Sequence, residues 1–408
     1  MTKEISFIHA ADLHLDSPFI GLANLPEFIY QAIKDSTFQA LDNLVQVAIE
    51  KQVDFVLLVG DLFDNEKQSI KAQMRLRTAF EKLSHHQIPV YLSYGNHDFI
   101  KGNKYRITFP ENVFVFPSEQ VEFFIYKKKR QPLATIHGFS YETRAVTTNK
   151  TIDYIVNEEL SSIPYHIAML HGSVEQTKEH DTYAPFQISE LKQKPFHYWA
   201  LGHIHKRQIL SEHPPIIYSG NIQGRHRKET GEKGCYHVTL SESGADFSFI
   251  SLEEIQFIHI DVDLTEINKI DEVEEVMTLE MSKLPEQMNY LIDLQLKIDD
   301  TERPDWQEKI TEVLDWLNEQ QETEDWKYIF RTRYHVQRKN DDLAGNHFIG
   351  ELIHQFEDIP IENYLNELLT HPKGKKYVSD FLATHSKVLL KEEAKQLLIH
   401  ELLYKRGE

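Results

Sequence analysis

Residues 93–98 read SYGNHD and directly follow a short apolar run, IPVYL at 88–92. The run is rich in residues that favour strands, which predicts a buried strand that ends near Ser93. Asn96, His97 and Asp98 stand at the tip of that strand. Asparagine and aspartate beside glycine often form turns, but histidine does not belong to this turn chemistry. The strand tip is therefore a candidate functional site.

Four other predicted strands end in the same kind of residues. The blocks are ADLH with Asp12 and His14, VGDLFD with Asp61 and Asp64, LHG with His171, and LGHIH with His203 and His205. Sites in open α/β sheets assemble at the carboxyl ends of strands, so groups far apart in sequence can meet there. Turn chemistry alone does not explain four histidines at such positions. We therefore expect these five strand ends to converge.

The first 250 residues alternate β-rich runs with helical patterns at about 28–49 and 69–83. The apolar runs, such as DFVLLVGDL at 54–62, show little alternation, which is typical of strands buried on both faces. Helices between such strands usually cover the faces of the sheets. The pattern predicts an α/β domain with sheets covered by helices.

The chain has 408 residues, which predicts two or three domains. Its composition changes near residue 252, where a strand-helix-strand-helix-strand pattern begins. After residue 340 the sequence is acidic, with short amphipathic helical stretches that need a surface to pack against. We therefore predict a first domain at 1–251, a small α/β domain at 252–340 and a helical region at 341–408.

The formal net charge of −20 is unevenly distributed along the chain. Residues 1–250 hold 29 acidic and 26 basic side chains, whereas residues 251–408 hold 35 and 18. The charge therefore does not exclude a polyanionic partner of the first domain, because bound cations would cancel carboxylate ligands there. The single cysteine, Cys235, excludes an internal disulfide, and we expect a cytoplasmic protein with no membrane span.

The residue types at the strand ends suit a pair of divalent cations. Imidazole nitrogens and carboxylate oxygens bind manganese, iron and zinc, and these ligand types alone do not choose among them. A bridging carboxylate holds two such ions about 3.5–4 Å apart, so that a shared water becomes hydroxide at neutral pH. Asp61 is the natural bridge. Gly60, Gly95, Gly172 and Gly202 beside the ligands are expected to allow tight turns.

The ordered blocks DLH, GDLFD, GNHD, HG and GHIH together resemble the signature of the calcineurin-like metallophosphoesterases. The length of the chain, the blocks KPFHYWALGHIHKRQIL and YSGNIQGR...GEKGCYHV, and the small domain resemble the bacterial SbcD-type DNA repair exonucleases. The motif resemblance covers about residues 5–240. Ala11 and Asp16 depart from residues common in that family, which leaves the subfamily open.

The resemblance implies a β-sandwich flanked by helices, a small α/β capping domain and a helical C-terminal region. It also assigns the ligands: Asp12, His14, Asp61 and His205 would hold one metal, and Asp61, Asn96, His171 and His203 the other. His97 would act as general acid on the leaving oxygen, and Asp98 would orient its ring and raise its pKa.

By the same resemblance, the protein would be a two-metal DNA exonuclease that cleaves the backbone by attack of a metal-bridging hydroxide. Manganese would be the working metal and a homodimer the assembly. The C-terminal helices would either dock an SMC-like coiled-coil ATPase or form a solvated bundle. Two other functions stay open: a phosphoesterase for nucleotides or phosphoproteins, and a scaffold that binds a partner.

Other polar residues have simpler interpretations. Asp64 either supports a ligand or is a surface turn or helix cap. His137 is also followed by a glycine, as in the LHG block, and we interpret it as a core or near-site histidine. The basic run Lys127–Arg130 is interpreted as a solvated hairpin turn. Better candidates for phosphate contacts than this run are the basic residues that follow a predicted strand end, Arg225, His226, Arg227 and Lys228.

Overall fold

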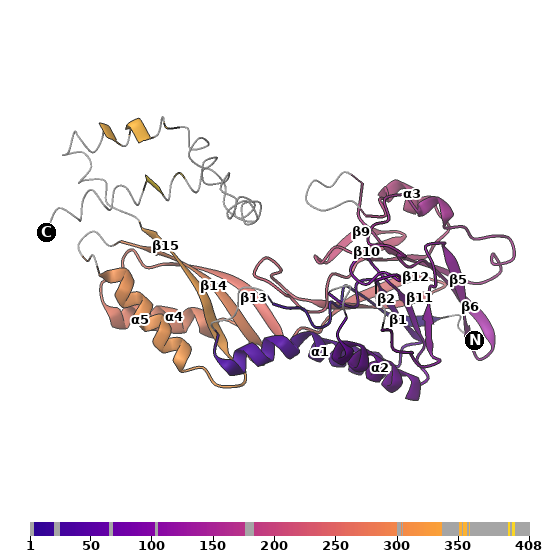
Figure 1. Cartoon of the computed structure of the whole chain (residues 1–408), viewed down its shortest axis with the longest axis horizontal. Helices are drawn as coiled ribbons and strands as arrows, with labels where there is room; N and C mark the ends of the chain where they lie inside the picture. Colours follow the sequence, from indigo (N-terminus) through magenta and orange to yellow (C-terminus); the bar gives the residue numbers. More distant parts are fainter. Residues whose placement is uncertain are drawn as a thin grey trace. The chain divides into compact units, whose positions relative to one another are not determined.

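Two six-stranded sheets form the larger part of the structure, a computed structural model (Figure 1). The residues that it describes are 4–19, 25–64, 68–102, 105–175, 183–299, 303, 305–336 and a few single positions beyond 350. One compact unit comprises residues 1–296 and 308–335, and a second comprises 297–307 and 336–408. The predicted helices of 341–408 lie almost entirely outside the described residues.

The first sheet has the strand order β12-β11-β1-β2-β3-β4. Its strands are β1 (Ile5–Ala11), β2 (Phe55–Val59), β3 (Val90–Ser93), β4 (Val113–Val115), β11 (Gly234–Ser241) and β12 (Gly244–Ser251). Strands β1 to β4 pair in parallel, and β11 pairs antiparallel with both β1 and β12. The carboxyl ends of β1, β2 and β3 therefore lie side by side at one edge.

The second sheet has the order β5-β6-β7-β8-β10-β9. Its strands are β5 (Glu122–Lys128), β6 (Gln131–Gly138), β7 (Tyr165–His171), β8 (Tyr198–Gly202), β9 (Gln208–Glu212) and β10 (Pro215–Tyr218). Strands β6, β7, β8 and β10 are parallel neighbours, and antiparallel hairpin partners close both edges. This parallel core brings the carboxyl ends of β7 and β8 together.

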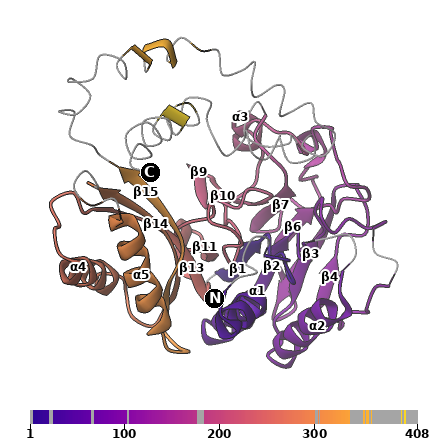
Figure 2. The ribbon, with the colours of Figure 1, turned by 60° about the vertical axis from the view of Figure 1, so that its left-hand side comes forward.

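The two sheets pack face to face and helices cover their outer faces. Phe7, Phe55 and Met169 belong to the apolar layer between the sheets. Helices α1 (Glu27–Glu50) and α2 (Ile70–His85) cover the first sheet through a second cluster (Figure 2). In a third apolar cluster, α3 (Ile188–Lys192) and neighbouring loops pack against the second sheet. A short 3₁₀ helix, Thr151–Asp153, precedes β7 in the chain. The predicted class, a β-sandwich flanked by helices, is confirmed.

The small α/β element that was expected after residue 252 is a three-stranded sheet with two helices. It comprises β13 (Ile255–Asp263), α4 (Ile270–Ser282), β14 (Asn289–Ile298), α5 (Trp306–Glu319) and β15 (Lys327–Val336). Leu291 of β14 and Trp326, which directly precedes β15, pack with Ile29 and Ile33 of α1 in one buried cluster. Residues 252–296 and 308–335 thus fall in the same compact unit as the sandwich. The three-domain division stays a prediction.

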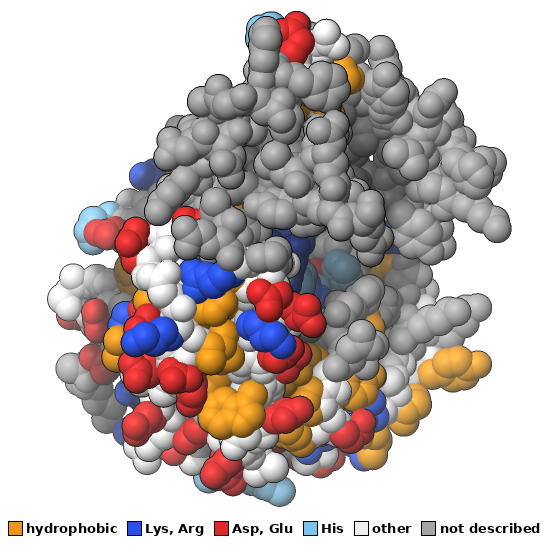
Figure 3. Space-filling model, turned by 90° about the vertical axis from the view of Figure 1, so that its left-hand side faces the viewer, with side chains coloured by type: hydrophobic (Ala, Val, Ile, Leu, Met, Phe, Trp, Pro, Cys, Tyr) orange, Lys and Arg blue, Asp and Glu red, His pale blue; other side chains and the backbone are white. Residues whose placement is uncertain are grey.

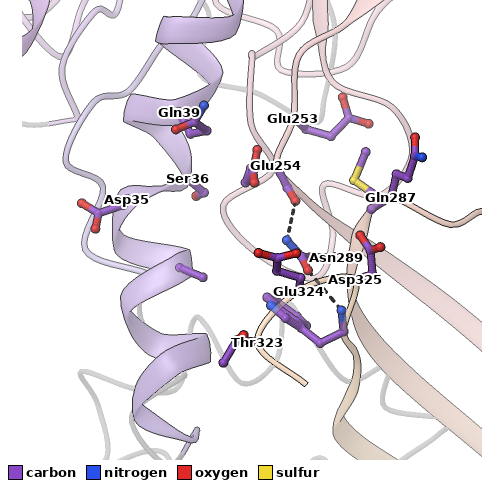
Figure 4. Close-up of a pocket in the computed structure, with 13 residues that line it drawn as sticks. Asp35, Ser36, Gln39, Glu253, Glu254, Gln287, Asn289, Thr323, Glu324 and Asp325 are labelled. Carbon is purple, nitrogen blue, oxygen red and sulfur yellow. Dashed lines mark hydrogen bonds between the residues drawn. The ribbon is translucent and has the colours of Figure 1, made fainter. Parts of the chain in front are cut away.

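A cavity of about 440 Å³ lies where α1 meets the small sheet (Figure 4). Five acidic side chains are among its lining residues: Asp35, Glu253, Glu254, Glu324 and Asp325. This corner of the molecule is therefore strongly acidic. Among the residues that the structure describes, no helix has the length and apolar character needed to cross a membrane.

Candidate metal centre

All five strand ends that were singled out meet at one end of the sandwich. Asp12 follows β1, Asp61 follows β2 and Asn96 follows β3, while His171 ends β7 and His203 follows β8. A left-handed backbone is uncommon for residues other than glycine, yet four candidate ligands adopt it: Asp12 at φ 53°, His14 at φ 42°, Asp61 at φ 49° and His203 at φ 94°. Such strain is typical of functional sites, where the surrounding structure holds it in place.

The first cluster contains Asp12, His14 and His205, whose ligand atoms lie within 4.8 Å of one another. His14 Nε2 is 3.0 Å from His205 Nε2. His205 Nδ1 donates to Glu229 Oε1 at 2.7 Å, so its Nε2 carries the free lone pair when the ring is neutral. Two imidazole nitrogens that face each other at this distance fit a shared cation.

The second cluster contains Asp61, His171 and His203, again within 4.8 Å. Asn96 Oδ1 joins it, at 3.0 Å from His171 Nε2 and 3.1 Å from His203 Nδ1. His171 Nδ1 donates to the carbonyl of Val59 at 3.1 Å, which directs Nε2 into the cluster. Oxygen and nitrogen acceptors face each other here, so a cation or a proton must lie between them.

Asp61 links the two clusters. Its Oδ2 lies 3.4 Å from His171 Nε2 in the second cluster and 3.9 Å from His14 Nε2 in the first. Its Oδ1 accepts a hydrogen bond from the backbone N–H of His97 at 2.9 Å. The structure thus fits the predicted bridging role, because one carboxylate oxygen faces ligands of both ions.

The protonation of the buried groups also fits cation binding. Burial lowers the pKa of His14 to about 3, so the ring is neutral and can ligate. Burial alone would raise the pKa of the Asp61 carboxyl, but the imidazoles of His171, His14 and His97 together outweigh it and hold that pKa well below its usual range. Burial lowers the pKa of His171, but Asp61 and Asp12 outweigh it and raise that pKa to about 9, so a cation at Nε2 would replace a proton there. Burial raises the pKa of Asp12, so its charged form is disfavoured until a bound cation stabilises the carboxylate.

The structure corrects the expected partner of His97. The Asp98 carboxylate accepts hydrogen bonds from the backbone N–H groups of Gly95 and Leu62, both at 2.7 Å, and so ties the tip of β3 to the tip of β2. His97 Nδ1 instead donates to the carbonyl of Asp64 at 2.8 Å. The prediction that Asp98 orients the His97 ring was wrong, because its oxygens are taken up by the loop backbone.

The glycines beside the ligands serve close packing more than turning. Only Gly60 of the four adopts a positive φ, at 72°. A Cβ on Gly95 would lie 2.2 Å from Asp61 Oδ1, and one on Gly202 would lie 2.1 Å from the Val59 carbonyl. Gly95 and Gly202 are therefore needed because a methyl group does not fit there. The prediction of a glycine-dependent turn holds for Gly60 alone, since it has the positive φ.

Gly95→Ala is expected to destroy the metal centre, because the added methyl group displaces the Asp61 carboxylate. We expect the rise in melting temperature on adding Mn²⁺ to disappear and hydrolysis to fall about a hundredfold or more. Gly231→Ala is the control: its Cβ meets nothing within 4 Å, and its φ of 78° carries only a backbone cost of about 1–2 kcal/mol. Equal metal responses in the two variants would contradict this account.

Glu229 is a site residue that the sequence interpretation missed. Besides accepting from His205, its Oε2 accepts from Asn221 Nδ2 at 3.0 Å and from the Arg225 backbone N–H at 2.8 Å. Arg225 in turn forms ion pairs with Asp64 and Glu229. Arg225 is therefore held by groups that support the centre, and its role in phosphate contacts stays a prediction. Asp64 belongs to the same support rather than to a free surface turn.

Glu229→Gln is expected to weaken metal binding about 10–100-fold, since removing the carboxylate behind a histidine ligand lowers its basicity and frees its ring. Titration with Mn²⁺ monitored by calorimetry measures the change. Glu232→Gln, which removes an exposed carboxylate on the same segment, is the matched control. A Glu229→Gln protein that binds both ions as tightly as the unaltered protein would remove Glu229 from the site.

Two other sequence interpretations are confirmed. His137 is buried, lies 5.0 Å from the ring of Phe196 and hydrogen-bonds Thr135 Oγ1 at 3.0 Å, so it is a core histidine. The basic run 127–130 lies in the hairpin of β5 and β6: Lys127 and Lys128 end β5, and Lys129 and Arg130 form the turn with positive φ. Within this run, Lys128 pairs with Asp54 at 2.8 Å.

The comparisons with known proteins agree with this geometry. Residues 5–207 match the calcineurin-like phosphoesterase family. A relative from Bacillus subtilis (strain 168), the uncharacterized metallophosphoesterase YhaO, is 37% identical over 410 residues, which cover 98% of this chain and 99% of that protein. The chain therefore belongs to the calcineurin-like phosphoesterase family. With two candidate metal sites, it is a metal-dependent phosphoesterase.

More distant relatives are similar over somewhat less than two thirds of the chain. The DNA double-strand break repair protein Mre11 of Methanocaldococcus jannaschii is 26% identical over 275 residues, 63% of this chain and 69% of that protein. The Mre11 protein of Sulfurisphaera tokodaii is 24% identical over 277 residues, 64% of each chain.

Proposed function

We propose that this metallophosphoesterase is a DNA phosphodiesterase of the exonuclease type, similar to the SbcD-type repair enzymes. The observation that carries the proposal is a pair of Asp/His clusters joined by Asp61, in a chain that is similar over 275 residues to a DNA double-strand break repair protein. Two ions that share a carboxylate suit in-line displacement at a phosphodiester, because they stabilise both the attacking and the leaving oxygen.

The residues present fit two divalent cations. Asp12, His14 and His205 would hold one, Asn96, His171 and His203 the other, and Asp61 both. Such ions would supply an activated water at neutral pH and neutralise charge on the phosphate. Manganese is our proposal for the working metal, from the resemblance to the SbcD-type exonucleases, because the ligand types alone do not choose among manganese, iron and zinc.

His97 is proposed to protonate the leaving oxygen. Its Nδ1–H donates to the Asp64 carbonyl, which leaves Nε2 as the atom that can exchange a proton with substrate. Its backbone N–H donates to Asp61 Oδ1. This hydrogen bond fixes the His97 backbone beside the bridging carboxylate and so places the ring next to the metal centre. Asp98 then acts as a positioning residue that fixes the ends of β2 and β3 relative to each other.

A panel of phosphate esters tests the substrate. End-labelled double- and single-stranded DNA, mononucleotides, a phosphopeptide and bis(p-nitrophenyl) phosphate are each incubated with the protein and Mn²⁺ or with chelator. We expect Mn²⁺-dependent release of nucleotides from DNA. Hydrolysis of nucleotides or the phosphopeptide with intact DNA would favour the alternative phosphoesterase function, and hydrolysis of none would favour a scaffold.

The capping role of 252–340, the homodimer and an SMC-like ATPase partner for 341–408 stay part of the proposal. Deletion of 341–408 tests the last of these. We expect the shortened protein to keep DNA cleavage and to lose capture of the ATPase. Unchanged capture would contradict a docking role for this region.

A further inference from the structure

Three arginines gather around one buried carboxylate on the small sheet. Arg227 Nη1 and Arg331 Nη1 each lie 3.9 Å from Asp293 Oδ2, and Arg333 Nε lies 3.4 Å from Asp293 Oδ1. Asp293 belongs to β14 and is 7% exposed. On a strand, residues two apart share a face, so Asp293 continues the face on which Leu291 packs toward α1. We call Arg227, Arg331 and Arg333 the arginine cluster.

The cluster carries more positive charge than its surroundings cancel. Its side chains are 32%, 32% and 39% exposed, so they reach solvent while Asp293 does not. His259 Nδ1 lies 3.2 Å from Arg333, and the ring also faces Asp261, whose side chain is 65% exposed. Exposed charges are strongly screened by water, so Asp261 offsets little of the excess.

The arginines also keep unused hydrogen-bond donors. Arg333 Nε and Asp293 Oδ1 are both buried and have no hydrogen-bond partner among the described residues, although they face each other at 3.4 Å. Each guanidinium has five N–H donors in a planar fork, which matches the oxygens of a phosphate group. The Asp293 carboxylate holds three guanidinium groups close together, an arrangement that suits an anion with several phosphate groups.

One short segment joins the arginine cluster to the metal centre. Arg227 is two residues from Glu229, whose carboxylate holds His205, so their Cα atoms are at most about 7.6 Å apart. Just before it, Gln223 binds the start of β13: its Nε2 donates to the Ile255 carbonyl at 2.6 Å, and its Oε1 accepts from Glu254 N–H at 2.9 Å. A phosphodiester chain in the centre would thus pass close to the cluster.

Charge on the small sheet is divided along β14. Asn289, at the start of the strand, lines the acidic cavity of Figure 4, and Asp293 lies four residues further, about 13 Å along the strand. The face shown in Figure 3 carries acidic, basic and hydrophobic side chains intermixed. The acidic cavity and the arginine cluster would repel and attract a polyanion respectively, which would favour one direction along β14.

We propose that the arginine cluster binds the phosphodiester backbone of the substrate on the side of the scissile bond that faces the small sheet. This inference rests on the proposed function and adds its specificity: the cluster selects polynucleotides over small phosphate esters. Asp293 positions the three guanidinium groups and relieves their mutual repulsion. Phosphate contacts of this kind position a nucleic acid without reading its sequence.

The test replaces all three arginines in the full chain, as Arg227→Gln, Arg331→Gln and Arg333→Gln together. The matched control is Lys127→Gln, Lys129→Gln and Arg130→Gln, which removes the same charge from the hairpin of β5 and β6. Binding of a fluorescein-labelled phosphorothioate DNA duplex in Mn²⁺ is followed by anisotropy at several salt concentrations. Hydrolysis of DNA and of bis(p-nitrophenyl) phosphate is measured in parallel.

We expect the arginine variant to raise the Kd for the duplex about tenfold or more and to reduce the slope of log Kd against log salt by about 2–3. The ratio of kcat/KM on DNA to that on the small ester should fall about tenfold or more, mainly through KM. The control should change Kd about twofold or less. If the triple variant does not fold, each single variant should reduce the slope by about 1.

Unchanged Kd and salt slope in the arginine variants would overturn the inference, as would a duplex that the unaltered protein does not bind. A protein that binds the duplex through the cluster, yet hydrolyses only the small ester, would instead overturn the proposed function and leave the cluster as a polyanion site. The binding and hydrolysis measurements therefore separate the two failures.

Discussion

Replacing Asp61 with asparagine is expected to abolish hydrolysis and to prevent two metal ions from binding at the same time. The side chain keeps its size but loses the charge with which Oδ2 faces His171 and His14, the ligands of two different clusters. Without this bridge, two cations so close together repel each other with no anion between them. We expect kcat/KM on any phosphodiester to fall about a thousandfold or more.

Metal content and activity measure this effect together. Elemental analysis of the Asp61→Asn protein should find at most one ion per chain, and its melting temperature should respond less to Mn²⁺. Asp42→Asn is the control, since Asp42 is a surface carboxylate paired with Arg75 and Lys82. If Asp61→Asn kept two ions and full activity, Asp61 would not be the bridge.

His97→Ala is expected to lower kcat about 10²–10⁴-fold on DNA and to leave both metal ions bound. The ring is in neither metal cluster, and the backbone N–H that binds Asp61 stays in place. The loss should be much smaller on bis(p-nitrophenyl) phosphate, because p-nitrophenolate leaves without needing a proton. This difference between substrates identifies a proton donor.

His86→Ala serves as the control for His97→Ala, because His86 is an exposed histidine at the end of α2. Metal content, kcat and KM are measured for both variants on both substrates. Equal losses on DNA and on the small ester would show that His97 only positions groups in the centre. A loss of one metal ion would make it a ligand.

The sequence was sufficient to predict the meeting of the strand ends. Buried strands are marked by runs such as FVLLV in β2, and their carboxyl ends in parallel sheets lie at one edge. The residue types at these tips can be read from the sequence of a single chain, with Asp12, Asp61 and Asn96 after the successive strands β1, β2 and β3. The helices α1 and α2 also began and ended within three residues of their expected bounds.

The supporting contacts were beyond the reach of sequence patterns. Glu229 reaches His205 because Arg225 to Glu229 fold back over the centre, and loop paths depend on tertiary packing. The family resemblance likewise implied that Asp98 orients His97, yet the Asp98 carboxylate accepts hydrogen bonds from the backbone N–H groups of Gly95 and Leu62. A carboxylate four residues after Arg225 was the one signal that pointed to Glu229.

The arginine cluster shows the same limit across a longer distance. Arg227 comes from the loop near the centre, whereas Asp293 belongs to β14 and Arg333 to β15. These charges meet only because the small sheet packs near that loop, so composition alone, with a net charge of −20, hides a local positive site. Charge distribution in space, not net charge, decides which partner such a surface attracts.

The most direct test of the metal centre is anomalous diffraction from crystals grown with Mn²⁺. The account predicts two peaks, one among Asp12, His14 and His205 and one among Asn96, His171 and His203, with Asp61 contacting both. A single peak, or two peaks that do not share Asp61, would contradict a bridged two-metal centre and the hydrolytic function built on it.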